Sequence, residues 1–443
     1  MEWAKKELSE IKLGDERLNK RSVKLLESLA AKPSASIPAA CGGWSETLAA
    51  YRFFGQEGIA WQDILQPHIA CTLIRSQAHP VVLCLQDTTE LDFNGQSIEG
   101  LGPLSYEAQR GMYLHPTLAM TPERLPLGVL DAWMWAREPK DADGERSGVS
   151  ESARWREGYE RVAEVAEAHP DTRWVYVADR EADILALMQR AHALKNPGDW
   201  LIRAKHNRKL GQDEAKLWEQ VGLAEVLGEI QFYLPPRPGR QGREVVQQLR
   251  SLGVHLPDGH GGTFEVTALL AREISPPVGE KPVEWRLLTN RLASTLKAVA
   301  ELIDWYRCRW EIEMFFNILK NGCKVEALQL SAMSRIELAL ALYMITAWRI
   351  GYLMRLGRTC PEMDCEAVFE REEWQAAWLV ARKPLPDKPP KLNEVIRVIA
   401  GFGGFLGRKS DGEPGAKTLW SGLQRVMDFA MGIRAMREIQ SCV

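Results

Sequence analysis

The sequence YRCRWEIEMFFNILK occupies residues 306–320 and is the most informative stretch of the chain. It continues the proline-free segment STLKAVAELIDW, so we predict one helix over about residues 294–320. At 100° per residue, four polar side chains of this helix fall within an arc of about 60°. They are Tyr306, Arg309, Glu313 and Lys320. Most other positions are apolar, which is typical of a buried helix.

The polar stripe on this helix needs a physical reason, because buried charge is costly unless it is paired or bound to a metal. One interpretation is an internal salt bridge from Arg309 to Glu313 at i,i+4 spacing, with Lys320 reaching towards solvent. The other interpretation is that the stripe faces a functional site. The helix alone favours neither.

Two acidic residues elsewhere favour the functional site. Asp87 follows the apolar run VVLCL and Gln86, and Asp179 follows VYVA; both runs are typical of buried strands. Each acid alone could be a cap or turn residue. Together with Glu313 they could converge on one spot, where three carboxylates would repel one another without a cation. Carboxylate oxygens without nearby His or Cys suit Mg²⁺ or Mn²⁺, and two such ions form a phosphoryl-transfer site.

The spacing Y-x2-R-x3-E-x6-K resembles the signature of one group of DDE transposases of bacterial insertion sequences, the cut-and-paste enzymes of the Tn5 and IS4 type. The resemblance extends to AAYRFF near the amino terminus and GGFLGRK near the carboxyl terminus, so it covers essentially the whole chain. It implies that Asp87, Asp179 and Glu313 are the catalytic, metal-binding acids. It also implies two Mg²⁺ ions, for which Mn²⁺ can substitute.

The same resemblance implies several residues that bind DNA. Arg203, in WLIRAKHNRK, is similar to the basic residue that follows the second acid of the family. Trp285, in EWRLLTN, is similar to the tryptophan on which a flipped base stacks; packing in a core is the alternative for a strand tryptophan. The phosphate contacts would come from the helix at Tyr306, Arg309 and Lys320. Asn317 departs from the family pattern, because a related transposase has a lysine at that position.

The fold class expected from the resemblance is α/β, a ribonuclease-H-like core with a β-rich insertion. Strand candidates are 80–86, 114–121, 126–135, 173–178 and 199–204, with a hairpin around ERLP at 123–126; helix candidates are 62–77, 151–168 and 181–194. We predict five regions: a helical DNA-end-binding domain (1–70), the first part of the core (71–208), a mainly antiparallel insertion (209–293), the second part of the core with Glu313 (294–365), and a helical dimerisation region (366–443).

The composition gives weaker constraints. The net charge of −3 and a pI of about 6.3 argue against a nucleic-acid partner, so DNA binding must rest on local basic clusters. Three are present, although each could be only a solvated face: Arg17, Lys20, Arg21 and Lys24; Arg203, Lys205, Arg208 and Lys209; and Arg237, Arg240 and Arg243.

Compartment can also be predicted. The eight cysteines form no CxxC pair, which favours a reducing cytosol. No signal peptide is evident, and the longest apolar run, 338–348, is too short to span a bilayer. We therefore expect a cytoplasmic bacterial protein that associates with the nucleoid when bound to DNA.

These observations predict a DNA transposase that binds terminal inverted repeats, cleaves DNA through a two-metal mechanism with a hairpin intermediate, and joins 3′-OH ends to target DNA as a homodimer. A metal nuclease of the same fold without strand transfer is one alternative. A catalytically silent DNA-binding regulator of transposition is the other.

Overall fold

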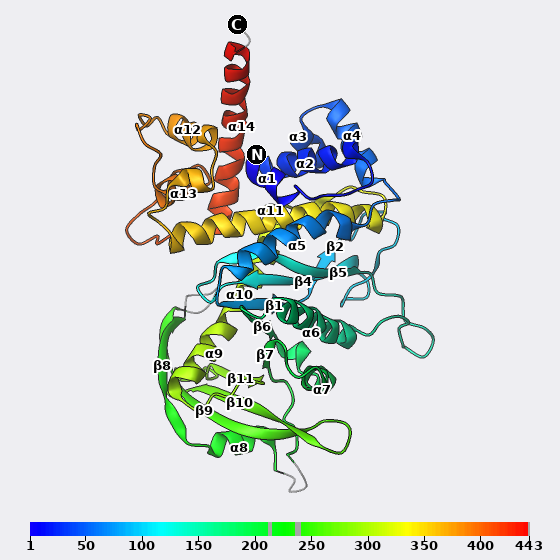
Figure 1. The fold of residues 1–443 in the computed structure, drawn as a ribbon, viewed down its shortest axis with the longest axis vertical. Coiled ribbons are helices and arrows are strands. Elements are labelled where there is room, and N and C mark those ends of the chain that lie inside the picture. Colours follow the sequence, from blue (N-terminus) through cyan, green and yellow to red (C-terminus); the bar gives the residue numbers. More distant parts are fainter. Residues whose placement is uncertain (211–214, 235–240, 442–443) are drawn as a thin grey trace. The chain divides into compact units, whose positions relative to one another are not determined.

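The computed structural model describes residues 1–210, 215–234 and 241–441, whose helices and strands are labelled in Figure 1. Contacts divide the chain into two units. The first unit contains Met1–Ser76, Thr88–Ser147 and Glu311–Val443, and the second contains Gln77–Asp87 and Gly148–Trp310. The five regions predicted from the sequence stay predictions.

The second unit begins its sheet with three parallel strands, which are β1 (Val81–Gln86), β6 (Arg173–Ala178) and β7 (Asp199–Arg203). β6 pairs with both neighbours. Their central residues are almost entirely buried and apolar, as parallel strands covered on both faces require. The structure confirms the predicted strands at 80–86, 173–178 and 199–204.

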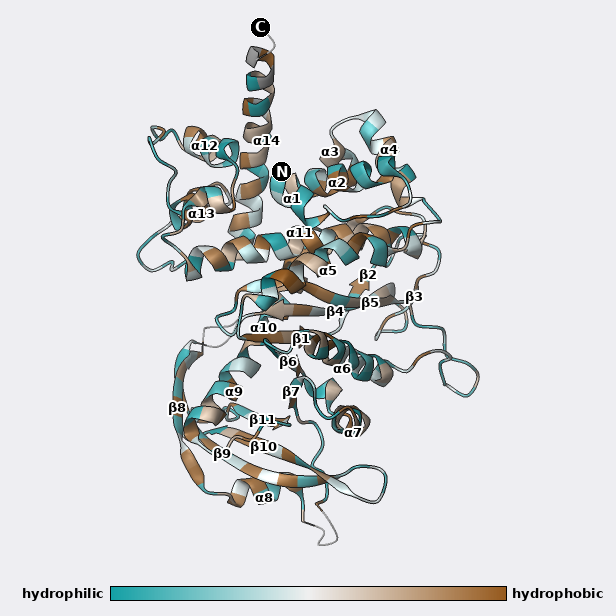
Figure 2. Cartoon of the chain, in the orientation of Figure 1, coloured by the Kyte–Doolittle hydropathy of each residue, from teal (hydrophilic) through white to brown (hydrophobic). Residues whose placement is uncertain are grey.

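Two helices accompany these parallel strands. α6 (Glu151–Ala168) precedes β6 and confirms the prediction for 151–168; its visible face is largely hydrophilic in Figure 2. α7 (Leu185–Ala193) connects β6 to β7, but it begins later than the predicted residue 181. The reason is local, because the Asp179 side chain caps a short 3₁₀ turn, Arg180–Ala182, and the backbone leaves helical geometry at Asp183.

The rest of this sheet is antiparallel, as predicted for 209–293. β11 (Glu284–Thr289) pairs with β7, and the order continues through β10 (Thr263–Glu273), β9 (Arg243–Pro257) and β8 (Val226–Leu234). The sequence patterns did not predict β9 or the helix α8 (Leu217–Leu223). Arg237 and Arg240 of the third basic cluster lie outside the described residues.

The helix predicted over residues 294–320 is divided into three segments. α9 (Leu296–Cys308) is followed by α10 (Trp310–Asn317) and a π-helical turn, Ile318–Gly322. Arg309 keeps helical dihedral angles (φ −52°, ψ −32°), but its N–H donates to the Tyr306 carbonyl at 3.0 Å, only three residues back. The prediction of one uninterrupted α-helix is therefore wrong, because the helix tightens at Arg309 and widens after Asn317.

The first unit begins with the expected helices, one of which confirms the prediction for 62–77. They are α1 (Glu2–Glu7), α2 (Glu16–Ala31), α3 (Ile37–Cys41), α4 (Trp44–Phe54) and α5 (Trp61–Gln77). Four strands follow: β2 (Thr89–Asp92), β3 (Gly102–Pro103), β4 (Arg110–Met120) and β5 (Pro126–Trp135). β4 and β5 form the hairpin predicted around residues 123–126, and Arg124 adopts the left-handed conformation in its turn (φ 68°).

The first unit ends with four helices: α11 (Met333–Thr359), α12 (Arg371–Val380), α13 (Leu392–Phe402) and α14 (Ala416–Ser441). α11 is long and apolar enough to cross a membrane by length and composition, yet 83% of its most apolar window is buried inside the protein. Burial of this kind is typical of a core helix.

Candidate active site

Asp87 and Asp179 lie at the same edge of the sheet. They directly follow Gln86 and Ala178, the last residues of β1 and β6, which are partners in the parallel register. Neighbouring strands lie about 4.8 Å apart, so the two acids leave the sheet side by side. Both residues are half-buried. The carboxyl ends of parallel strands thus place two acidic side chains in one location.

Arg309 supplies positive charge to this acidic pair. Its Nη1 atom donates to Oδ2 of Asp87 at 2.5 Å, and the arginine side chain is only 7% exposed against 14% for the aspartate. The guanidinium carbon also lies 5.3 Å from the ring centroid of Trp310. A buried, charge-assisted hydrogen bond of this length is strong and holds the Asp87 carboxylate in place.

The pKa values of two buried tyrosines are affected by the charges of these acids and arginines. Burial raises the pKa of Tyr176, and the charges of Asp179 and Asp87 raise it further. Burial also raises the pKa of Tyr306, opposed by Arg309 and Arg203, while Asp179 adds to the increase. The Tyr176 hydroxyl donates to Oε1 of Gln86 at 2.7 Å, inside the sheet. Both acids, both arginines and Tyr306 therefore share one region of the second unit.

Arg203 and Trp285 lie at this edge as well. Arg203 is the last residue of β7 and faces Leu287 of β11 across the ladder, and the Ala204 N–H donates to the Arg286 carbonyl at 2.7 Å. Because β11 runs antiparallel, Trp285 lies beyond the carboxyl end of β7.

The Trp285 ring has a neighbour that sequence reasoning missed. It stacks on Phe232 of β8 with centroids 5.5 Å apart, and the guanidinium of Arg307 lies 4.6 Å from the Phe232 centroid. These contacts connect strands far apart in the sheet order, so no local sequence pattern could indicate them.

Glu313 and Lys320 belong to the first unit. Glu313 is exposed on α10, and its convergence with Asp87 and Asp179 stays a prediction. The Nζ atom of Lys320 lies 3.4 Å from Oε1 of Glu326. Asn317 is half-buried, and its side-chain oxygen accepts from Asn321 at 2.8 Å.

The donor chemistry at the strand ends fits a divalent cation. Asp87 and Asp179 offer carboxylate oxygens, the ligands that Mg²⁺ and Mn²⁺ prefer. Across residues 1–210, 215–234 and 241–441, no three His, Cys, Asp or Glu residues are grouped so as to hold a metal ion. The two acids alone therefore do not complete a metal site in the described residues.

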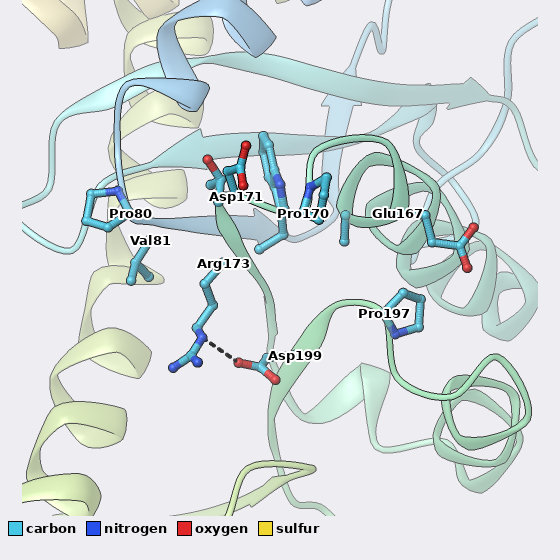
Figure 3. Close-up of a pocket in the computed structure, with 11 residues that line it drawn as sticks. Pro80, Val81, Glu167, Pro170, Asp171, Arg173, Pro197 and Asp199 are labelled. Atoms are coloured by element: carbon cyan, nitrogen blue, oxygen red, sulfur yellow. Dashed lines mark ion pairs between the residues drawn. The ribbon is translucent and has the colours of Figure 1, made fainter.

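A hollow of about 670 Å³ lies at the opposite edge of the same strands, as Figure 3 shows. Its lining includes Val81, Arg173 and Asp199, the first residues of β1, β6 and β7. Arg173 and Asp199 form an ion pair there with 3.6 Å between Nε and Oδ2. This hollow is separate from the acidic pair by the full length of the strands.

Acids at the carboxyl ends of parallel strands in an α/β sheet are compatible with a ribonuclease-H-like fold. Comparison with known families identifies the family. Residues 1–59 match the family described as "Transposase DNA-binding", residues 154–349 match "Transposase DDE domain", and residues 345–442 match "Transposase Tn5 dimerisation domain". The chain belongs to the DDE transposases of the Tn5 and IS4 type, and Asp179 and Glu313 lie within the matched DDE range.

A solved structure is also similar, the piggyBac transposase synaptic complex with hairpin DNA. The identity is 9% and the TM-score 0.36, and the match covers 82% of this chain and 56% of that chain. The chain thus spans little more than half the length of this solved protein.

By these matches the chain contains a transposase DNA-binding region, a transposase DDE domain and a Tn5-type dimerisation region.

Proposed function

We propose that this transposase excises and inserts DNA by a cut-and-paste reaction, with Asp87, Asp179 and Glu313 holding two Mg²⁺ ions. The observation that carries the proposal is the pair of acids side by side at the carboxyl ends of β1 and β6, with the Arg309 guanidinium on Asp87. Two metal ions, when bound, stabilise the attacking and leaving oxygens of a phosphoryl transfer. Glu313 follows Arg309 by one helical turn and is the expected third ligand.

The surrounding residues bind and orient the DNA. Arg309 neutralises Asp87 and holds its carboxylate in place through the buried hydrogen bond. Arg203, Tyr306 and Lys320 contact phosphates close to the cleaved bond. Trp285 receives a base that has left the stack, and base–aromatic stacking of this kind contributes about 1–3 kcal/mol.

The proposed reaction proceeds in successive phosphoryl transfers. Water first attacks the phosphodiester at the transposon end and releases a 3′-OH. That 3′-OH then attacks the opposite strand, which forms a hairpin and releases the flanking DNA. A second water opens the hairpin, and the restored 3′-OH attacks target DNA. Each transfer makes one P–O bond and breaks one, so no covalent protein intermediate is needed.

The remaining predictions concern partners and compartment. Residues 1–70 bind the terminal inverted repeat, and residues 366–443 join two copies of the chain. We propose a homodimer on DNA in which each end is cleaved by the subunit bound mainly to the other end. The protein acts in the bacterial cytoplasm on the nucleoid.

Cleavage of a plasmid that carries the element's flanking inverted repeats tests the proposal, with Mg²⁺, with Mn²⁺ and with EDTA. We expect metal-dependent double-strand breaks at the repeat edges and hairpin ends on denaturing gels. Breaks without any strand-transfer product would favour a nuclease of the same fold. Binding without breaks under either metal would favour a silent DNA-binding regulator and would remove the proposed role of the acids.

A further inference from the structure

The loop that follows β7 carries several positively charged residues at the carboxyl edge. It reads AKHNRK over residues 204–209 and comes directly after Arg203. Lys205, His206 and Lys209 are exposed, whereas Arg208 is not. A flexible loop loses conformational entropy when its lysines bind a ligand. A loop whose backbone is already held in place therefore binds at a smaller entropic cost.

Asp183, at the start of the preceding connection, holds this loop. Its side chain is completely buried, and its Oδ2 atom accepts from the backbone N–H of Lys205 at 2.7 Å and of His206 at 2.8 Å. Its Oδ1 atom lies 2.6 Å from Nη1 of Arg208, whose Nη2 donates to the Asp183 carbonyl at 3.0 Å. One buried carboxylate thus contacts the loop at three residues.

Arg208 consequently stabilises the conformation of the loop. Its side chain is 14% exposed and is directed to Asp183, so it is poorly placed for the DNA contact that its basic cluster predicted. A buried carboxylate without a partner would be strongly unfavourable, and Arg208 neutralises it. The exposed positive charge of the loop is then carried by Lys205 and Lys209.

Trp218 of α8 holds the same loop from a different element. Its Nε1 atom donates to the His206 carbonyl at 3.1 Å, and its backbone N–H donates to Oδ1 of Asn207 at 3.0 Å. The backbone of the loop is therefore fixed at consecutive residues by hydrogen bonds from two elements.

Lys205 lies close to Asp179 in the register of the sheet. Ala178 of β6 pairs with Ile202 of β7, so Asp179 and Arg203 leave neighbouring parallel strands at the same edge. Lys205 follows Arg203 by two residues and is exposed there.

We propose that Asp183 is a positioning residue that holds the 204–209 loop so that the ammonium group of Lys205 contacts a DNA phosphate beside Asp179. The inference rests on the proposed DNA cleavage at this edge. It adds a residue that touches no DNA itself and acts only through the loop.

The first part of the test measures the loop directly in the free protein. In Asp183→Ala, hydrogen–deuterium exchange at the Lys205 and His206 amides should accelerate by at least about tenfold, since each loses its acceptor. Asp258→Ala is the matched control, because Asp258 also accepts from two backbone N–H groups, those of His260 and Gly262, in the turn between β9 and β10. That control should leave exchange in the loop unchanged.

The second part is a double-mutant cycle on cleavage rate and on affinity for a duplex that carries the terminal repeat. Lys205→Ala should lower cleavage by about tenfold or more, as expected for a lost charge-assisted contact. In the Asp183→Ala background the same change should cost less than about twofold, because the lysine is already misplaced. Should Asp183→Ala fail to fold, Asp183→Asn replaces it, since Asn keeps the volume but removes the charge that pairs with Arg208, and the same loss of coupling is expected.

The outcomes separate this inference from the proposed function. If the unaltered protein binds the repeat but does not cleave it, the proposed function fails, and the cycle is read on affinity alone. If amide exchange in the loop is unchanged, or if the Lys205 and Asp183 losses simply add, Asp183 does not position Lys205 and the inference is overturned. Accelerated exchange together with strong coupling establishes it.

Discussion

The two edges of the parallel strands in the second unit contain the same kinds of residues but differ in how these are held. At the carboxyl edge, Asp87 meets Arg309 at 2.5 Å, and both side chains are largely buried. At the amino edge, Asp199 meets Arg173 at 3.6 Å, and the arginine side chain is 53% exposed. An ion pair in water contributes little, whereas a buried one constrains geometry and charge. Both edges contain an acid and an arginine, so the candidate site is distinguished by the burial of its arginine.

The largest expected effect comes from removing an acid at the carboxyl edge. Asp87→Asn should lower cleavage of the terminal repeat by about a thousandfold, the upper end of the 10²–10³ that loss of charge stabilisation at a reacting centre typically costs. Cleavage is measured by single-turnover assays on plasmid, and binding of the repeat should persist.

Asp199→Asn at the amino edge is the matched control for that acid, with cleavage within about twofold of the unaltered protein. Equal losses in the two variants would show that the edges do not differ in function.

The arginines give the next largest contrast. Arg309→Lys should lower cleavage by about a hundredfold, because lysine cannot reproduce the planar guanidinium contact with Asp87 and misplacement at a reacting centre is costly. Arg173→Lys replaces an exposed arginine and should change cleavage by less than about twofold. A small effect of Arg309→Lys on cleavage would indicate that Arg309 acts mainly in packing.

A substitution of Trp285 tests whether the carboxyl edge binds an unstacked base. Trp285→Ala should reduce hairpin formation by about tenfold, in line with the 1–3 kcal/mol of base stacking, while the initial nick is retained. Both products are quantified on denaturing gels, so the nick serves as an internal control. Equal loss of nick and hairpin would indicate that Trp285 acts mainly through its stack with Phe232.

The smallest effect concerns stability at the amino edge. Burial raises the pKa of Asp199, and Arg291 and Arg173 only partly oppose it. Because the folded pKa exceeds the unfolded one, ionisation of Asp199 lowers the free energy of unfolding as pH rises from the unfolded pKa through the folded pKa.

Asp199→Asn should therefore be more stable than the unaltered protein near neutral pH, by about 1 kcal/mol or less, and should lose this advantage near about pH 3. Urea titrations at the two pH values measure the difference. A variant less stable at neutral pH would mean that the ion pairs of Asp199 outweigh its burial.

Local patterns predicted much of the secondary structure for a clear reason. Buried parallel strands need long apolar runs, so β1, β6 and β7 could be located from VVLCL, WVYVA and WLIR alone. β9 was missed because one of its alternating buried positions is the polar residue Gln247, and because the alternation is interrupted between Leu249 and Val254. The interruption of the helix at Arg309 was missed because no proline or glycine marks it.

The sequence by itself determined the candidate acids, the polar residues of the 306–320 helix and the family, since these depend on residue type and spacing along the chain. The tertiary structure decided the partners: Arg309 on Asp87, Phe232 on Trp285, and Asp183 with the loop after β7. These contacts join residues far apart in the chain, and hydrogen bonds and ring contacts form only where the packing of the sheet brings the atoms within a few ångströms.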